Sequence, residues 1–211
     1  MNALLEELME RYPALKECRA EIERAGELMM ETYRAGGKIM VCGNGGSCAD
    51  SDHIVGELMK GFLKLRPIKG KKRDALCQAL GDSGEEIVDK LQGGIPAISL
   101  PAQAAVLSAF ANDVDASLVY AQLVYGYARK GDLLIGLSTS GNSKNVVAAA
   151  RVAKAVGISA LALTGSRESK LSAICDRTVR VPETETFKVQ ELHLPIYHYL
   201  CAYMENEIFG D

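Results

Sequence analysis

The sequence lacks the features that would place the protein on nucleic acid or on a membrane. Its net charge is −3, so there is no basic excess to neutralise a phosphate backbone. No apolar run approaches the roughly 20 residues that a membrane-spanning helix needs. The opening residues 1–7 are acidic and amphipathic, which is unlike a secretion signal. We therefore expect a cytoplasmic protein that binds neither nucleic acid nor membrane.

Paired cysteines are also missing. The chain has six cysteines but no C-x-x-C pair, so neither a disulfide framework nor a zinc–thiolate site is indicated. We interpret them as buried free thiols. Their positions are Cys18, Cys42, Cys48, Cys77, Cys175 and Cys201. The length of 211 residues suits one α/β domain with a full core, spanning residues 1–211.

The most informative stretch is an apolar run followed by a segment dense in hydroxyl groups. Residues 133–137 read LLIGL, residues 138–143 read STSGNS, and helix-forming sequence follows. A strand, a small-residue turn and a helix start together direct free backbone N–H groups at an anion. One serine would be an ordinary N-cap, but this density of donors indicates a phosphate site. The Gly-Lys-Ser/Thr of a P-loop is absent, which argues against a nucleoside triphosphate.

Strand-like and helix-like segments alternate along the rest of the chain. This order predicts an α/β fold with a parallel sheet covered by helices on both faces. In such sheets ligands bind at the carboxyl ends of the strands. The expected strands are 38–42, 95–100, 133–137, 158–165 and 178–182, and the expected helices include 49–62, 102–111, 116–129, 170–175 and 187–208. Asn112 and Asp113 are expected to break the helical region between residues 102 and 129.

Two further segments stand outside this alternation. Residues 1–35 form an N-terminal helical arm that Pro13 divides in two. Because this arm exceeds the cover that one small domain needs, we expect it to pack against another subunit. Residues 63–94 are an insertion with a basic run, a turn at Pro67 and a helix start near 81–86. This insertion is either a solvated decoration or a lid over the site.

Candidate metal ligands lie on two predicted helices. A second small-residue turn at 43–47 leads into a helix that carries Asp50, His53 and Glu57. His53 and Glu57 are four residues apart and so share one face of the helix. They could bind one divalent metal or simply form a surface hydrogen-bonded pair. The closing helix carries two of the three histidines of the chain, and one of them, His198, lies near Gln190 in sequence.

These motifs together resemble one enzyme family. The segment CGNGGS at 42–47, with the helix that follows, resembles the first half of the sedoheptulose 7-phosphate isomerases, also called phosphoheptose isomerases. The segment STSGNS at 138–143 is similar to their phosphate loop, and VQELH at 189–193 with His198 is similar to their C-terminal helix. The similarity covers most of the chain except the insertion. It implies a SIS (sugar isomerase) domain, a flavodoxin-like three-layer sandwich.

The resemblance also implies a site. Glu57 and His198 would transfer protons, and zinc would be bound by His53, Glu57, Gln190 and His198. The substrate would contact Asn44, Gly45, Gly46, Ser47, Glu57, Asn112, Asp113, Ser138, Thr139, Ser140, Ser143 and Gln190. The family is tetrameric, so the resemblance implies a homotetramer with active sites at subunit contacts. Two departures bear on the sugar, because Cys48 stands where the family often has histidine and Gly61 where a basic residue is common.

The implied reaction converts sedoheptulose 7-phosphate to D-glycero-D-manno-heptose 7-phosphate through an enediol. A carboxylate base and an imidazole acid suffice for the proton transfers, and zinc can stabilise the enediolate. The alternatives are a SIS isomerase of another phosphosugar, or a non-catalytic SIS tetramer that binds a protein partner such as the replication initiator DnaA. The presence of all four predicted zinc ligands favours the enzyme.

One geometric difficulty accompanies the predicted zinc site. Gln190 and His198 are eight residues apart, about 12 Å along a straight helix. Either Gln190 precedes the regular helix, or the helix bends at Pro195, or a second subunit completes the site.

Overall fold

Five parallel strands form the sheet at the centre of the molecule. The computed structural model describes residues 3–210, and the strands follow the order β2-β1-β3-β4-β5. Every neighbouring pair is parallel, so the predicted parallel α/β sheet is confirmed. The strands are β1 (Ile39–Cys42), β2 (Ala97–Ser99), β3 (Leu133–Leu137), β4 (Ser159–Thr164) and β5 (Arg177–Arg180).

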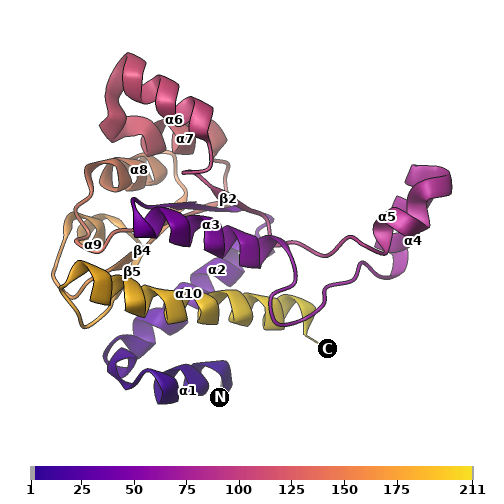
Figure 1. Ribbon diagram of the computed structural model, residues 1–211, viewed down its shortest axis with the longest axis horizontal. Helices are drawn as coiled ribbons and strands as arrows, with labels where there is room; N and C mark the ends of the chain where they lie inside the picture. Colours follow the sequence, from indigo (N-terminus) through magenta and orange to yellow (C-terminus); the bar gives the residue numbers. More distant parts are fainter. Residues whose placement is uncertain (1–2, 211) are drawn as a thin grey trace.

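Helices cover both faces of this sheet (Figure 1). Side chains alternate along each strand, so Ile39 and Val41 of β1 join the core on one face, while Met40 and Cys42 join the core on the other. The first core includes side chains from α2 (Arg19–Arg34), α3 (Gly46–Met59) and α10 (Thr186–Phe209). The second includes side chains from α7 (Val119–Tyr127), α8 (Lys144–Ala155) and α9 (Lys170–Ile174). The predicted three-layer arrangement is therefore confirmed.

The N-terminal arm packs against its own chain. It consists of α1 (Ala3–Arg11), a 3-10 helix at Pro13–Cys18 and α2, so Pro13 divides it as predicted. α2 contacts β5 and α10, and α1 contacts α10. Buried Leu5 and Ile22 belong to the first core. The arm is therefore not surplus cover, and this part of the argument for a second subunit is wrong. The expected helix start at Asn2 lies outside the described residues.

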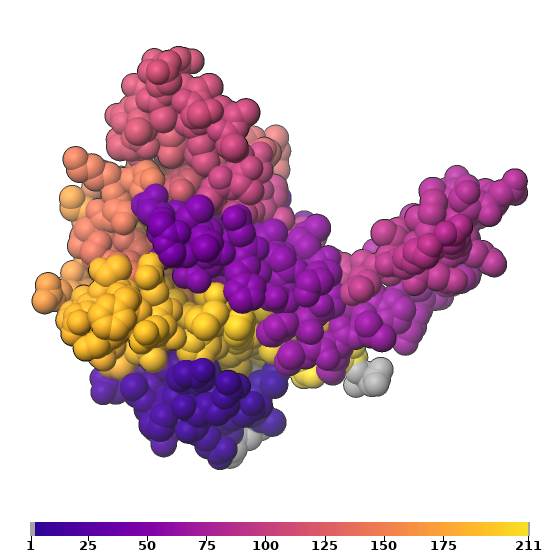
Figure 2. Space-filling view, in the orientation of Figure 1, coloured from indigo at the N-terminus to yellow at the C-terminus, as the bar shows by residue number. Residues whose placement is uncertain are grey.

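The insertion contains a helical hairpin that projects from the body (Figures 1 and 2). Its elements are α4 (Gly70–Leu80), a 3-10 turn (Gly81–Ser83) and α5 (Gly84–Val88). α4 was not predicted from the sequence, and its first turns hold part of the basic run. No residue of α4 is buried, so it has no apolar stripe that a periodicity argument could detect. In this chain the hairpin does not fold back over the body.

Several predicted element boundaries are wrong. α3 begins and ends three residues earlier than expected, and it ends at Met59 because Lys60 adopts an extended conformation with φ −137° and ψ 175°. β5 begins at Arg177 and ends at Arg180 rather than spanning 178–182. Asn112 and Asp113 do not interrupt the helical structure, since α6 (Ala104–Phe110) continues into a π-helical turn (Ala111–Asp115). The break comes at Asp115, whose carboxylate accepts a hydrogen bond from the Ser117 backbone and so caps the next helix.

Two expectations from composition can be compared with the structure. Within residues 3–210, no helix has both the length and the apolar character needed to cross a membrane. All six cysteines are free, but only Cys18, Cys42 and Cys201 are fully buried. The other three are partly exposed, so the prediction of buried thiols holds for half of them.

Candidate functional site

The two small-residue turns lie side by side at the carboxyl ends of two neighbouring strands. β1 pairs directly with β3 in parallel, so the turns that follow them, 43–47 and 138–143, emerge together. The strand order reverses between β1 and β3, which is the position where open α/β sheets bind ligands. The side-chain amides of Asn44 and Asn145 exchange two hydrogen bonds of 2.9 and 2.8 Å and join the turns. The predicted pair of ligand-facing strand ends is thus one continuous surface.

The hydroxyl groups of the second turn face one another rather than the helix behind them. The Oγ atoms of Ser138 and Ser143 are 2.9 Å apart, and Ser138 is buried. Ser143 occupies the N-cap position of α8, but its side chain makes no capping hydrogen bond. An ordinary N-cap therefore does not explain this serine. The hydroxyls lie beside the positive end of the α8 dipole, which is a suitable arrangement for a phosphate group.

Two glycines of these turns allow close contacts with neighbouring segments. Gly141 has a φ of +64°, and a Cβ atom there would lie 2.1 Å from Oγ of Ser169. Any other residue would therefore be strained and would collide with the segment before α9. A Cβ atom on Gly46 would lie 2.6 Å from Nε2 of Gln190. The missing side chain of Gly46 lets Gln190 pack closely against the start of α3.

Three of the four predicted metal ligands gather where α3 and α10 run side by side (Figure 1). Nε2 of His53 lies 3.2 Å from Oε1 of Glu57 and 3.4 Å from Nε2 of His198. Burial lowers the pKa of His198, and the nearby His53 lowers it further. The His198 ring is therefore neutral near pH 7. The other carboxylate oxygen of Glu57 accepts a hydrogen bond from Nζ of Lys60 at 3.1 Å.

Tyr197 and Asp50 hold the Nδ1 side of the His53 ring, opposite the side that faces Glu57 and His198. The Tyr197 hydroxyl donates to Oδ1 of Asp50 at 3.1 Å and lies 3.0 Å from Nδ1 of His53. Burial raises the pKa of Tyr197, and Asp50 raises it further, so the phenol keeps its proton. Since that proton goes to Asp50, the hydroxyl oxygen of Tyr197 is left to accept a hydrogen bond from His53, which favours a proton on Nδ1. A proton on Nδ1 is the tautomer that metal ligation through Nε2 requires.

Gln190 does not join this cluster within the chain. It lies against Gly46, seven residues before His53, which is about 10 Å along α3. α10 is continuous from Thr186, so the explanation that Gln190 precedes the regular helix is wrong. Across residues 3–210, no set of three or more His, Cys, Asp or Glu side chains is placed so that it could hold one metal ion. The donor types fit zinc, but this chain alone does not form a complete set of ligands.

The remaining predicted contacts divide between the two turns and a separate segment. Gly45, with a φ of +56°, and buried Ser47 belong to the first turn and the start of α3. Thr139 and Ser140 belong to the second turn, where Ser140 accepts a hydrogen bond from the Asn142 backbone at 3.1 Å. The side chains of Asn112 and Asp113 are exposed and hydrogen-bond to each other at 2.8 Å. Neither has a hydrogen bond to the turns among the described residues.

A groove of about 220 Å³ leads to His198 and is partly formed by α1. Glu7, Arg11 and Tyr12 line it together with His198 and Phe62. Glu7, Arg11 and Tyr12 were not predicted as neighbours of the site, because nothing in an amphipathic arm indicates which residue it will face. Tyr197 was missed for a similar reason, although it directly precedes His198.

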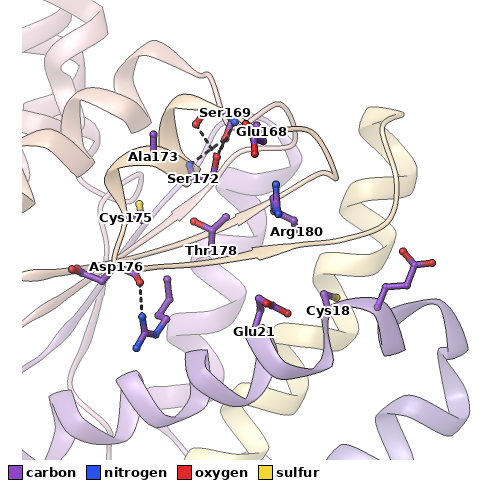
Figure 3. A pocket seen from close by; sticks show the side chains of 12 residues that line it. Cys18, Glu21, Glu168, Ser169, Ser172, Ala173, Cys175, Asp176, Thr178 and Arg180 are labelled. Atoms are coloured by element: carbon purple, nitrogen blue, oxygen red, sulfur yellow. Dashed lines mark hydrogen bonds between the residues drawn. The ribbon is translucent and has the colours of Figure 1, made fainter.

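A second groove, of about 470 Å³, lies beside the edge strand β5 (Figure 3). It holds charges of both signs, because Glu21, Glu168, Arg177 and Arg180 all line it. None of the predicted site residues lines it. This groove lies beside β5 and not at the carboxyl ends of β1 and β3, where open α/β sheets bind ligands, so we place the site at the strand ends instead.

Comparison with known proteins gives a consistent result. The family description "SIS domain" matches residues 97–204, and a second description of the same name matches residues 4–73. The chain is 32% identical to the phosphoheptose isomerase of Akkermansia muciniphila over 96% of this chain and 94% of that protein. It is 34% identical to that of Rhodospirillum rubrum over 92% and 89%. The solved structure of phosphoheptose isomerase GmhA from Neisseria gonorrhoeae is 28% identical, with a TM-score of 0.73 over 95% of this chain and 96% of that one.

Proposed function

The chain belongs to the SIS domain family, and we propose that it converts sedoheptulose 7-phosphate to D-glycero-D-manno-heptose 7-phosphate. Its relatives are similar over nearly their whole length and are named phosphoheptose isomerases. They support an aldose–ketose isomerase of phosphosugars. The choice of the seven-carbon sugar is the proposal.

One observation carries the proposal: a carboxylate and two imidazoles meet where α3 and α10 pack together. His53 lies between the other two residues, 3.2 Å from the Glu57 carboxylate and 3.4 Å from the His198 ring. Isomerisation removes a proton from C1 of the ketose, forms an enediol and returns a proton to C2. Glu57 serves as the base in this scheme. His198 exchanges protons with the sugar oxygens as a neutral imidazole.

The turn at 138–143 would hold the phosphate end of the sugar. Ser138 and Ser143 present hydroxyls at the start of α8, away from the reacting carbons. Binding energy from this remote group can position C1 and C2 against the proton-transfer residues. The two hydrogen bonds between the side-chain amides of Asn44 and Asn145 hold the two turns in position relative to each other.

Zinc is part of the proposal because the donors suit it. His53, Glu57, Gln190 and His198 would hold the ion, with Gln190 reaching it through a second subunit. A bound zinc would orient the sugar oxygens and stabilise the negative charge of the enediolate. A proton on Nδ1 of His53, which the Tyr197 hydroxyl oxygen can accept as a hydrogen bond, would leave Nε2 free for this role.

Exchange of the substrate proton with solvent tests the proposal directly. The protein is supplied with zinc and incubated with sedoheptulose 7-phosphate in deuterated water, and the C1 signal is followed by NMR. We expect the wild-type protein to incorporate deuterium, and Glu57→Gln to do so at least about 100-fold more slowly. Glu86→Gln, on the projecting hairpin, is the matched control and should exchange normally.

Two results would change the conclusion. If the wild-type protein binds sugar phosphates but exchanges a proton with none of them, the isomerase proposal fails and a non-catalytic role replaces it. If another phosphosugar exchanges much faster, the reaction class stands and only the sugar is wrong.

A further inference from the structure

A buried ion pair lies at the carboxyl ends of α3 and α10, the two helices that carry the site. Arg66 and Glu205 are each 1% exposed, and Nε of Arg66 lies 2.8 Å from Oε1 of Glu205. Neither residue belongs to the phosphate turn or to the proton-transfer cluster. Replacing a buried ion pair by apolar residues is often neutral or stabilising, so stability alone does not explain this pair.

Arg66 acts on the backbone of the proposed catalytic base. Its Nη2 donates to the carbonyl oxygen of Glu57 at 3.1 Å, and its Nη1 donates to that of Leu58 at 2.7 Å. These carbonyls lie in the last turn of α3, which ends at Met59, so they have no partners within the helix. The guanidinium also lies over the ring of Phe209, 4.9 Å from its centroid. Arg66 thus holds the carboxyl end of α3 from inside the core.

Glu205 completes the connection from α10. Its carboxylate accepts hydrogen bonds from the backbone N–H groups of Phe62, Leu63 and Lys64 at 2.8–3.0 Å. Burial raises its pKa, but these N–H groups and Arg66 lower the pKa overall. The carboxylate is therefore ionised. Glu205 follows His198 by seven residues, two helical turns, so both lie on the face of α10 that contacts α3.

We propose that Arg66 and Glu205 are positioning residues that keep Glu57 and His198 at a constant separation. The pair holds α3 at the carbonyl of Glu57 itself and holds α10 two turns beyond His198. A shift of about 1 Å in a catalytic group can cost about 100-fold in rate. This inference rests on the proposed isomerase function, since it assigns the pair to that reaction.

Arg66→Lys is the direct test. Lysine keeps the positive charge beside Glu205, but its single ammonium cannot make the planar contacts to both carbonyls and the carboxylate. We expect kcat for proton exchange to fall at least about tenfold. KM for the sugar phosphate should change less than about threefold, because the phosphate turn is held separately. If Arg66→Lys does not fold, Glu205→Gln gives the same comparison.

Asp132→Asn is the matched control. Asp132 is 3% exposed and accepts hydrogen bonds from the backbone N–H groups of Lys38 and Arg129 at 2.9 and 2.7 Å, and from the Lys38 ammonium. It lies where β1 and β3 begin, at the opposite edge of the sheet from the site. Its replacement should lower the melting temperature as Arg66→Lys does, with kcat unchanged.

The outcomes separate this inference from the proposed function. If Arg66→Lys and Asp132→Asn lower the melting temperature alike and both keep wild-type kcat, the positioning role is overturned. If the wild-type protein has no isomerase activity, the proposed function fails first. The NMR signals of the His53 and His198 rings then provide a second readout. Shifts in Arg66→Lys but not in Asp132→Asn support the geometric connection, and unchanged signals in both overturn it.

Discussion

The Nε2 atoms of His53 and His198 lie 3.4 Å apart, although 145 residues separate them in the chain. Two protonated rings would repel each other at this distance. The pKa of His198 is lowered by burial and by the neighbouring His53, which keeps that ring neutral. A neutral His198 ring beside His53 and the Glu57 carboxylate is suited to proton transfer and to zinc binding.

We predict that Tyr197→Phe slows the reaction without unfolding the protein. The substitution removes the hydroxyl that connects Asp50 to Nδ1 of His53, so the His53 tautomer is no longer set. Loss of such an outer partner typically costs 10- to 100-fold in metal affinity or activity. Turnover and zinc affinity should both fall by roughly this factor. Tyr125→Phe, at an exposed position, is the control, and equal rates in the two variants would contradict the prediction.

We predict that substitution of Ser138 and Ser140 together by Ala weakens phosphosugar binding at least about tenfold. A hydrogen bond to a charged group contributes about 1.5–3 kcal/mol, and both hydroxyls belong to the phosphate turn. Calorimetric titration with sedoheptulose 7-phosphate measures the effect. Ser159→Ala, at the first residue of β4 and so at the opposite edge of the sheet, is the control. Unchanged affinity in the double variant would remove the phosphate-site assignment.

We predict that chelation of zinc lowers turnover and that added zinc restores it. His198→Asn should reduce both metal content and turnover, because His198 would serve as ligand and proton-transfer residue. Metal content is measured beside the rate, since lost zinc would otherwise be mistaken for lost acid–base chemistry. Full activity in thoroughly metal-free protein would exclude zinc from the reaction.

We predict a loss of stability at acid pH that depends on His193. This side chain is fully buried, and burial lowers its pKa to about 4. Its ring nitrogens have no hydrogen-bond partner, although the nearby Thr164 backbone offsets part of the shift. The unfolded chain therefore binds the proton more tightly. Stability is complete above about pH 6.5 and decreases toward pH 4, by at most about 3 kcal/mol.

Chemical denaturation at pH 7.0 and 4.5 measures this dependence. His193→Leu should show a smaller difference between the two pH values than the wild-type protein. Ile196→Val, in the same core, should lower stability by a similar amount at both. An equal pH dependence in wild type and His193→Leu would show that other groups cause the acid sensitivity.

The oligomeric state stays a prediction. The N-terminal arm no longer supports an oligomer. Gln190 still does, because it lies against the start of α3 and is too far from His53 to share a metal with it within one chain. A homotetramer with shared sites would supply Gln190 from a second subunit. Sedimentation should give a tetramer at micromolar concentration, and a fully active monomer would contradict this.

The sequence by itself determined the parts whose information is local. The strand at 133–137 agrees with β3 residue for residue, because a short apolar run before small hydroxyl residues has few other interpretations. The shared helix face of His53 and Glu57 follows from a spacing of four residues, and their atoms do lie 3.2 Å apart. The parallel sheet and its two covered faces follow from the alternation of strands and helices.

Only the tertiary structure decided which distant groups meet. Arg66 lies in a basic run that looks solvated in sequence, yet it is buried against Glu205, 139 residues away. The contact of Tyr197 with Asp50 spans 147 residues. Such pairings depend on how α3 and α10 pack, and packing is set by the whole core rather than by a local period. α4 could not be predicted from a local pattern, because none of its residues is buried and it therefore carries no apolar stripe.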